Sequence, residues 1–182
     1  FEEDALLGRV SPYLIQPLHP FLRYFAQHLA EQITRFPFAL LIAIFFFAIN
    51  SESIWIPSPT MLIISMICTF FSFLIQFLMQ SIIASLCFWT EKASSIEKLL
   101  FIPTLFLSGL LAPVASFPES VKSWIYLTPF PYLINFPASV LSGIETKVFL
   151  GILVQIFWIF LFYFIFRKVW KLGTKKFTAM GL

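Results

Sequence analysis

Polar side chains recur along residues 61–89, a long apolar stretch that contains no charged residue, proline or glycine. They are spaced four, three, four and four residues apart, so in a helix they lie on one side: Ser65, Thr69, Ser72, Gln76 and Gln80. A glutamine amide inside hydrocarbon needs a hydrogen-bond partner, so this polar stripe should face protein or water and not lipid. The stripe could line a path for an amphipathic substrate, or it could join helices by hydrogen bonds, and the sequence leaves both interpretations open.

Groups that could catalyse a reaction or hold a metal ion do not cluster in the sequence. His19 and His28 lie nine residues apart without a group of Cys or Asp around them, so we expect no metal site. Cys68 and Cys87 are 19 residues apart on one predicted helix, and the corresponding distance of about 28 Å is too long for a disulfide. The six glycines form no G-x-x-x-x-G-K-[ST] loop, so the energy for any transport must come from a partner. We expect no catalytic residue.

The composition places these residues in a membrane protein. Hydrophobic residues make up 59% of the chain and charged residues 12%, with a mean hydropathy of +0.90, whereas a soluble domain carries about a quarter charged residues. The net charge of +3 is too small to indicate nucleic-acid binding. Four stretches are predicted to cross the bilayer, which gives an all-α polytopic fold: about 36–54, 61–89, 99–115 and 148–166.

The distribution of Lys and Arg predicts the orientation of these four spans. If residues 1–35 are cytoplasmic, ten of the 12 Lys and Arg residues lie inside, and only Lys122 and Lys147 lie outside. This asymmetry is the one that membrane proteins prefer. Both ends are then cytoplasmic, and residues 167–182 form a basic cytoplasmic tail to a transmembrane domain that covers residues 36–182.

Residues 116–147 lie on the outer side in this topology, and they are apolar but rich in proline. They are predicted to form a re-entrant hairpin of two short helices, 119–127 and 132–142, before a stop at Gly143. Irregular backbone at membrane depth requires surrounding protein or a cavity, so the hairpin could gate a pathway. An apolar external loop is the alternative. The residues assigned to this outer gate are Gly109, Pro113, Pro118, Pro129, Phe130, Pro131, Tyr132, Pro137 and Gly143.

The first 35 residues are expected to form a cytoplasmic coupling segment followed by an interfacial helix. Pro20 suits the first turn of a helix. After it, apolar residues gather on one face of an amphipathic pattern that leads into the first span: Phe21, Phe25, Leu29, Ile33 and Phe36. A simple surface anchor is the alternative interpretation.

Five motifs in order resemble the membrane subunits of ABC-2 type exporters, in the branch described as ABC-2 family transporter proteins. They are GRVSPYLIQPL (8–18), FWTEKASSIEKL (88–99), LSGLLAPVASFP (107–118), LTPFPYLINFPASVLSG (127–143) and VWKLGTKKFTAMG (169–181). The resemblance covers essentially the whole chain. Members of the family have six spans, so the chain resembles a fragment that lacks the first two. Gln16 stands where the resemblance leads us to expect a basic residue.

The resemblance implies a permease that exports a hydrophobic or amphipathic substrate across the plasma (bacterial inner) membrane. It implies a second permease subunit and cytoplasmic ATP-binding subunits as partners, with no cofactor bound directly and ATP used through the partner. The residues that would pass on the movement of the ATPase are Gly8, Tyr13, Leu14, Pro17 and Leu18. A polytopic membrane enzyme acting on lipid, with the hairpin as its lid, and a structural membrane scaffold remain as alternatives.

Overall fold

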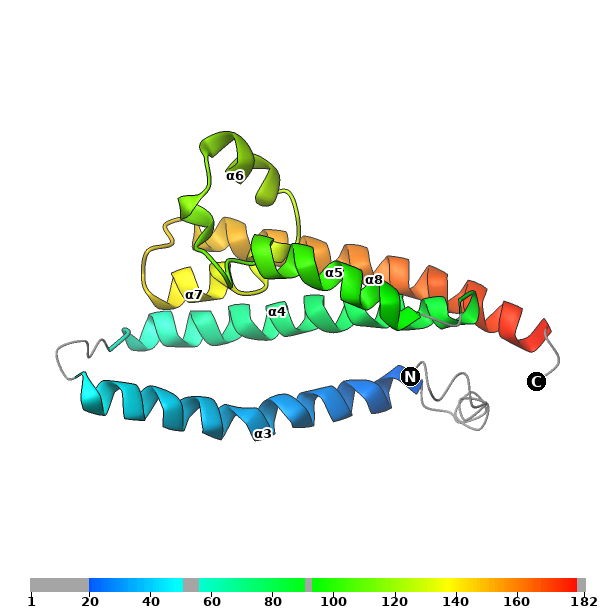
Figure 1. Ribbon diagram of the computed structural model, residues 1–182, viewed down its shortest axis with the longest axis horizontal. Coiled ribbons are helices and arrows are strands. Elements are labelled where there is room, and N and C mark those ends of the chain that lie inside the picture. The colour runs from blue at the N-terminus through cyan, green and yellow to red at the C-terminus, as the bar shows by residue number, and fades with distance from the viewer. Residues whose placement is uncertain (1–19, 51–55, 91–92, 180–182) are drawn as a thin grey trace. The chain divides into compact units, whose positions relative to one another are not determined.

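The computed structural model describes residues 20–50, 56–90 and 93–179, and these residues form helices and turns without a strand (Figure 1). The chain divides into two compact units. One unit contains the helix α3, Pro20–Ile49. The helices from residue 57 onward belong to the other unit. Each unit is described by itself.

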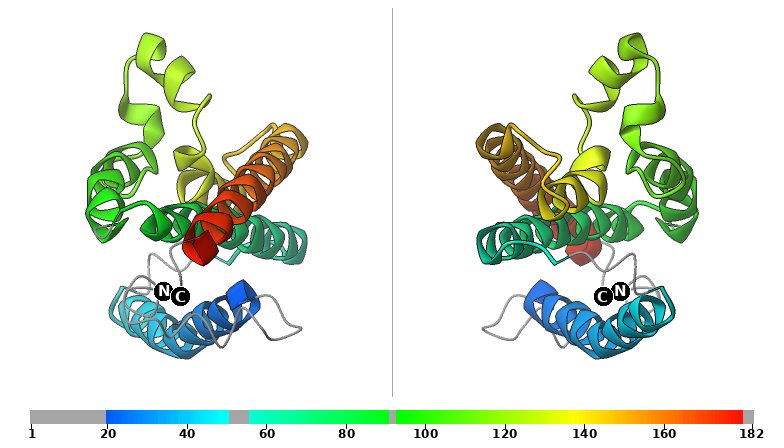
Figure 2. Two further views of the ribbon diagram at one scale, coloured as in Figure 1. Left: turned by 90° about the vertical axis from the view of Figure 1, so that its right-hand side faces the viewer. Right: turned by 90° about the vertical axis from the view of Figure 1, so that its left-hand side faces the viewer.

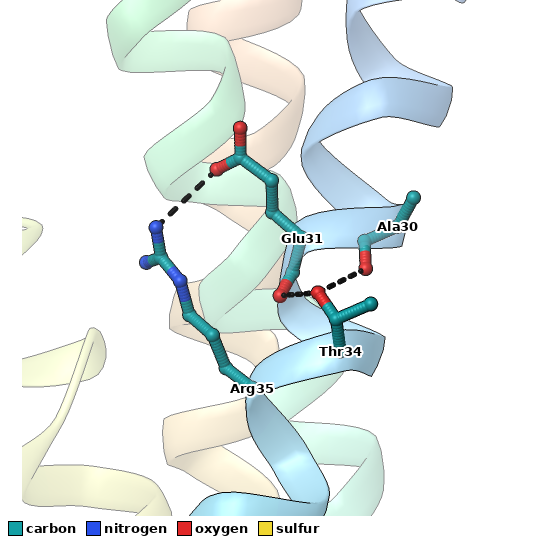
Figure 3. Close-up of polar contacts among 4 residues, drawn as sticks. All are labelled: Ala30, Glu31, Thr34 and Arg35. Atoms are coloured by element: carbon teal, nitrogen blue, oxygen red, sulfur yellow. Dashed lines mark hydrogen bonds and ion pairs between the residues drawn. The ribbon is translucent and has the colours of Figure 1, made fainter.

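Helix α3 is continuous over 30 residues, so the predicted interfacial helix and the predicted first span are parts of one helix. Pro37 lies inside it and removes one backbone donor. Just before Pro37, the polar side chains bond within the helix (Figure 3). The Thr34 hydroxyl donates to the carbonyls of Ala30 and Glu31 at 3.0 and 2.9 Å, and Arg35 forms an exposed ion pair with Glu31 at 3.4 Å.

The second unit is built on two long helices, α4 (Pro59–Ser85) and α8 (Val148–Ala179). The Ser58 side chain caps α4 by accepting from the amide of Met61, and Pro59 fits the first turn because its missing donor is not needed there. A short 3-10 turn, η2 (Leu86–Phe88), follows α4. α4 and α8 run in the same direction and pack together, whereas α5 (Ala93–Leu107) runs in the opposite direction (Figure 1).

The chain between α5 and α8, residues 108–147, is called the α5–α8 connection below. It contains two 3-10 turns and two short helices: η3 (Val114–Ser116), α6 (Glu119–Ile125), η4 (Phe130–Tyr132) and α7 (Asn135–Leu141). α7 lies between α5 and α8 and packs on α4, while α6 extends away from them (Figure 2). Two short helices thus lie within their predicted ranges, and each is shorter than predicted. That they form a re-entrant hairpin is not confirmed.

Within the described residues, three helices are long and apolar enough to cross a membrane: Pro20–Ile49, Pro59–Phe88 and Val148–Lys176. They correspond to three of the four predicted spans. The predicted third span, residues 99–115, begins within α5 and extends past its end at Leu107. The helix stops there because Gly109 has a φ of +87°, which a right-handed helix cannot contain. α5 has 15 residues, or about 22 Å against a hydrocarbon core of about 30 Å. The four-span count is not confirmed.

Candidate functional site: a polar core that joins α4, α8 and the connection

The side chain of Gln155 is fully buried in the N-terminal quarter of α8 and joins three elements. Its amide nitrogen donates to the carbonyl oxygen of Cys68 on α4 at 3.0 Å and to that of Tyr132 in η4 at 3.0 Å. It also lies 3.1 Å from the hydroxyl of Ser72 on α4. We call Gln155, Ser72 and the two carbonyls of Cys68 and Tyr132 the polar core.

The chemistry of these groups fixes the orientation of the Gln155 amide. Backbone carbonyls only accept hydrogen bonds, so the amide nitrogen, and not its oxygen, must face Cys68 and Tyr132. The Ser72 hydroxyl lies 2.7 Å from the Tyr132 carbonyl and 2.9 Å from the Cys68 carbonyl, and it has a single hydrogen to donate. The amide oxygen of Gln155 is buried and has no hydrogen-bond partner within the described parts of the chain.

An apolar cluster surrounds the polar core and excludes water from it. Its buried members are Cys68, Tyr132, Phe136 and Val140, with Ile64, Val148, Ile152, Val154 and Trp158 packed against them. A hydrogen bond in such surroundings has no competing water, and a group that loses its partner there stays unsatisfied. The polar core should therefore hold the connection in one position against α4 and α8.

Two glycines let the connection approach the long helices closely. A Cβ atom on Gly151 of α8 would lie 2.0 Å from Cε2 of Phe136, so the aromatic ring occupies the space that a side chain would need. Gly143 ends α7 with a φ of +73°, and a Cβ there would lie 3.0 Å from Cε of Met61 on α4. Glycine at these positions is required by packing at Gly151 and by backbone conformation at Gly143.

Asn135 ties the two proline-rich parts of the connection to each other. Its backbone amide donates to the carbonyl of Ser108 at 2.9 Å, and its side-chain oxygen accepts from the amide of Val114 at 3.4 Å. Gly109 passes directly against it, because a Cβ there would lie 2.9 Å from the Asn135 Cβ. The start of α7 and the chain that follows α5 are thus held together.

The sequence as a whole matches one family. The sequence model described as ABC-2 family transporter protein matches residues 2–181, which is nearly the entire chain. The chain belongs to the ABC-2 family transporter proteins. This membership indicates the membrane domain of an ABC transporter, in a multi-pass membrane protein. Comparisons with curated proteins and with solved structures gave no match.

In this ABC-2 family chain the residues of the predicted polar stripe differ in burial. Ser65 and Ser72 are buried, Gln76 and Gln80 are half-buried, and Thr69 is exposed. The hydroxyls of Ser65 and Thr69 donate to carbonyls of their own helix, those of Leu62 and Ser65, at 2.9 and 2.8 Å. Of the stripe, Ser72 is the residue that bonds to another element, since its hydroxyl reaches the Tyr132 carbonyl.

The predicted gate residues divide into a buried and an exposed group. The residues near the polar core are buried: Pro129, Pro131, Tyr132 and Pro137. Pro113, Pro118 and Gly143 are exposed, and Gly109 and Phe130 are half-buried.

Burial raises the pKa of the Tyr132 phenol, and Tyr126 and Glu145 raise it further. The phenol therefore stays protonated and donates to the carbonyl of Tyr126 at 3.3 Å.

The predicted coupling residues lie outside the described part of the chain. They are Gly8, Tyr13, Leu14, Pro17 and Leu18, all within residues 1–19.

Sequence reasoning missed Gln155, the central residue of the polar core. The sequence did point to it, because Gln155 is the only amide side chain among residues 148–166, a predicted span without charged residues or proline. The rule that a glutamine in hydrocarbon needs a partner was applied to Gln76 and Gln80, and it would have selected Gln155 as well.

A second contact joins the other ends of α4 and α8. The ring of Phe88 in η2 lies 5.4 Å from the ring of Trp170, centroid to centroid. A Cβ on Gly173 would lie 2.2 Å from Cδ2 of Phe88, so glycine again makes room for an aromatic ring. The two long helices are thus joined at the polar core and again toward their C-terminal ends.

Proposed function

We propose that the chain is a permease subunit of an ABC-2 type exporter, which moves a hydrophobic or amphipathic substrate and is energised by separate ATP-binding subunits. The family match over residues 2–181 carries this proposal. In such a transporter the chain would pair with a second permease subunit. The cytoplasmic segment with Tyr13, Leu14 and Leu18 would contact the ATPase.

The direction of the helices supports a fourth crossing of the membrane by α5. α4 and α8 run the same way, so if both cross the bilayer, the chain between them must return once (Figure 1). α5 is the helix that runs in the returning direction. The distribution of Lys and Arg then favours cytoplasmic ends and an outer position for the α5–α8 connection.

The polar core supports a gating role for the connection. Gln155 and Ser72 hold η4 against the two long helices by hydrogen bonds to a single carbonyl, that of Tyr132. A relative shift of α4 and α8 would change both bonds together, so movement of the helices would reach the connection directly. This coupling is what a gate over a substrate path needs.

Inside-out membrane vesicles test the transport function. The protein is co-expressed with a candidate ABC ATP-binding subunit from the same organism, and vesicle uptake of a fluorescent amphipathic dye is followed after ATP is added. We expect ATP-dependent uptake, which should disappear when the phosphate-binding lysine of the ATPase is changed to alanine. Uptake that is equal in both preparations, together with failure of the two proteins to purify as a complex, would overturn the proposal.

A further inference from the structure

One face of α8 stays exposed along the helix and changes from apolar to cationic at Arg167. Successive residues are rotated by about 100° around the helix axis, so residues at similar angles lie in one strip along the helix. The exposed apolar residues of this strip are Phe149, Leu150, Leu153, Phe157, Phe160 and Phe164. Arg167, Lys168 and Lys171 are exposed as well and fall in the same arc of roughly 100°. We call these residues the α8 strip.

Packing on the opposite side of α8 fixes which way the strip faces. Gln155 bonds to α4, and Gly173 accommodates the ring of Phe88. Both residues lie roughly 180° around the helix from the middle of the strip. The strip therefore faces away from α4 and η2, toward whatever surrounds this unit of the protein.

The length of the apolar part matches a bilayer. The 18 residues from Phe149 to Phe166 rise about 27 Å, close to the hydrocarbon thickness of about 30 Å. Arg167 then comes where the headgroups begin, and its guanidinium lies 6.0 Å from the ring centroid of Tyr163. An aromatic ring beside a cation is typical of this depth. From residue 146 to residue 182 the sequence contains no Asp or Glu.

We propose that the α8 strip binds anionic phospholipids of the leaflet in which the C-terminal part of α8 lies. The acyl chains would cover the apolar residues, and the phosphates would contact Arg167, Lys168 and Lys171. A second copy of the chain fits this face poorly, because a two-fold axis along the membrane normal would place the same cations against each other. An acidic protein surface would account for the cations. It would not account for the exposed apolar residues on the same face of α8.

Spin-labelled lipids test the proposal with the purified complete protein in phosphatidylcholine vesicles. The measurement is the relative association of labelled phosphatidylglycerol and labelled phosphatidylcholine with the protein. We expect a preference for phosphatidylglycerol that falls about fivefold for each headgroup-binding cation removed. In the variant K168Q/K171Q, phosphatidylglycerol and phosphatidylcholine should thus associate with the protein almost equally. The matched control K122Q/K147Q removes two cations from the connection and should keep the preference.

A measurement on the unchanged protein covers the case in which the variant does not fold. Salt at about 1 M shortens the Debye length to about 3 Å, so the preference should largely disappear. Equal preference in wild type and K168Q/K171Q would overturn the proposal. So would loss of the ATP-binding subunit from K168Q/K171Q with an unchanged lipid preference, since the cations would then serve a protein partner.

Discussion

The side-chain amide of Gln155 lies 3.0 Å from the carbonyl oxygen of Tyr132, across the gap between α8 and the proline-rich connection. The hydroxyl of Ser72 lies 2.7 Å from the same oxygen. One backbone carbonyl thus joins the connection to both long helices. Because apolar side chains surround these groups, no water can replace a lost bond at low cost.

Replacing Gln155 with leucine should destabilise the protein by about 1–2 kcal/mol, which is the scale of interhelical hydrogen bonds in membranes. Leucine keeps most of the volume but donates no hydrogen bond to Cys68 or Tyr132. We expect a lower thermal unfolding temperature in detergent. The control is Gln76→Leu, because Gln76 is half-buried and takes no part in the polar core. Equal effects of the two substitutions would show that the polar core contributes nothing specific.

Gly151→Ala should also destabilise the protein, although alanine is the better helix former by about 1 kcal/mol. The added Cβ would lie 2.0 Å from the ring of Phe136, and relieving such a clash costs about 1–3 kcal/mol. In a Phe136→Leu background the ring is gone, so Gly151→Ala should then cost much less. The comparison is a double-mutant cycle of thermal unfolding. Additive effects would mean that the two residues do not touch.

Cysteine labelling in intact cells tests the orientation. A single cysteine at Ser120, in a background with Cys68→Ser and Cys87→Ser, should react with an impermeant thiol reagent added outside. Ser120 is exposed in α6, so its position is accessible to the reagent. A single cysteine at Lys171, also exposed, should react only after the membrane is opened. The reverse pattern would place the connection in the cytoplasm.

Changing Leu14 and Leu18 to aspartate tests the proposed contact with the ATPase. Pro17 between them fixes its own φ, so we expect the two apolar side chains to act as a stiff pair. Charges there should prevent their burial in a groove of the ATP-binding subunit. We expect ATP hydrolysis without dye uptake, or loss of the ATPase from the complex, while the unfolding temperature stays unchanged. Full dye uptake by the double variant would remove this coupling mechanism.

The long helices could be predicted from the sequence because hydrophobicity and the absence of helix-breaking residues are properties of each helix alone. The absence of proline and glycine in residues 61–89 indicates α4, and the uninterrupted run 148–166 indicates α8. The stop after α5 was less visible, since Gly109 ends the helix through its backbone conformation, while Pro103 is accommodated inside it.

The polar core could not be derived from periodicity alone, because it depends on how helices rotate against each other. Ser72 and Thr69 look equivalent in the sequence, yet Ser72 is buried beside Tyr132 and Thr69 is exposed. The rotation of α4 is decided by contacts from distant residues, such as Gln155. Likewise, the need for glycine at position 151 arises from Phe136, which belongs to another helix.

The single hydrogen of the Ser72 hydroxyl gives the polar core an unequal response to separation. If η4 left α4, this hydroxyl would donate instead to the Cys68 carbonyl of its own helix, 2.9 Å away. The Tyr132 carbonyl would lose both donors, and the Gln155 amide would lose one acceptor. The hydrogen bonds lost on displacement are therefore those of the connection and of α8. The Ser72 hydroxyl of α4 keeps an acceptor within its own helix. Substitutions at position 155 should accordingly shift the balance between the docked and the displaced state without disturbing the hydrogen bonds within α4.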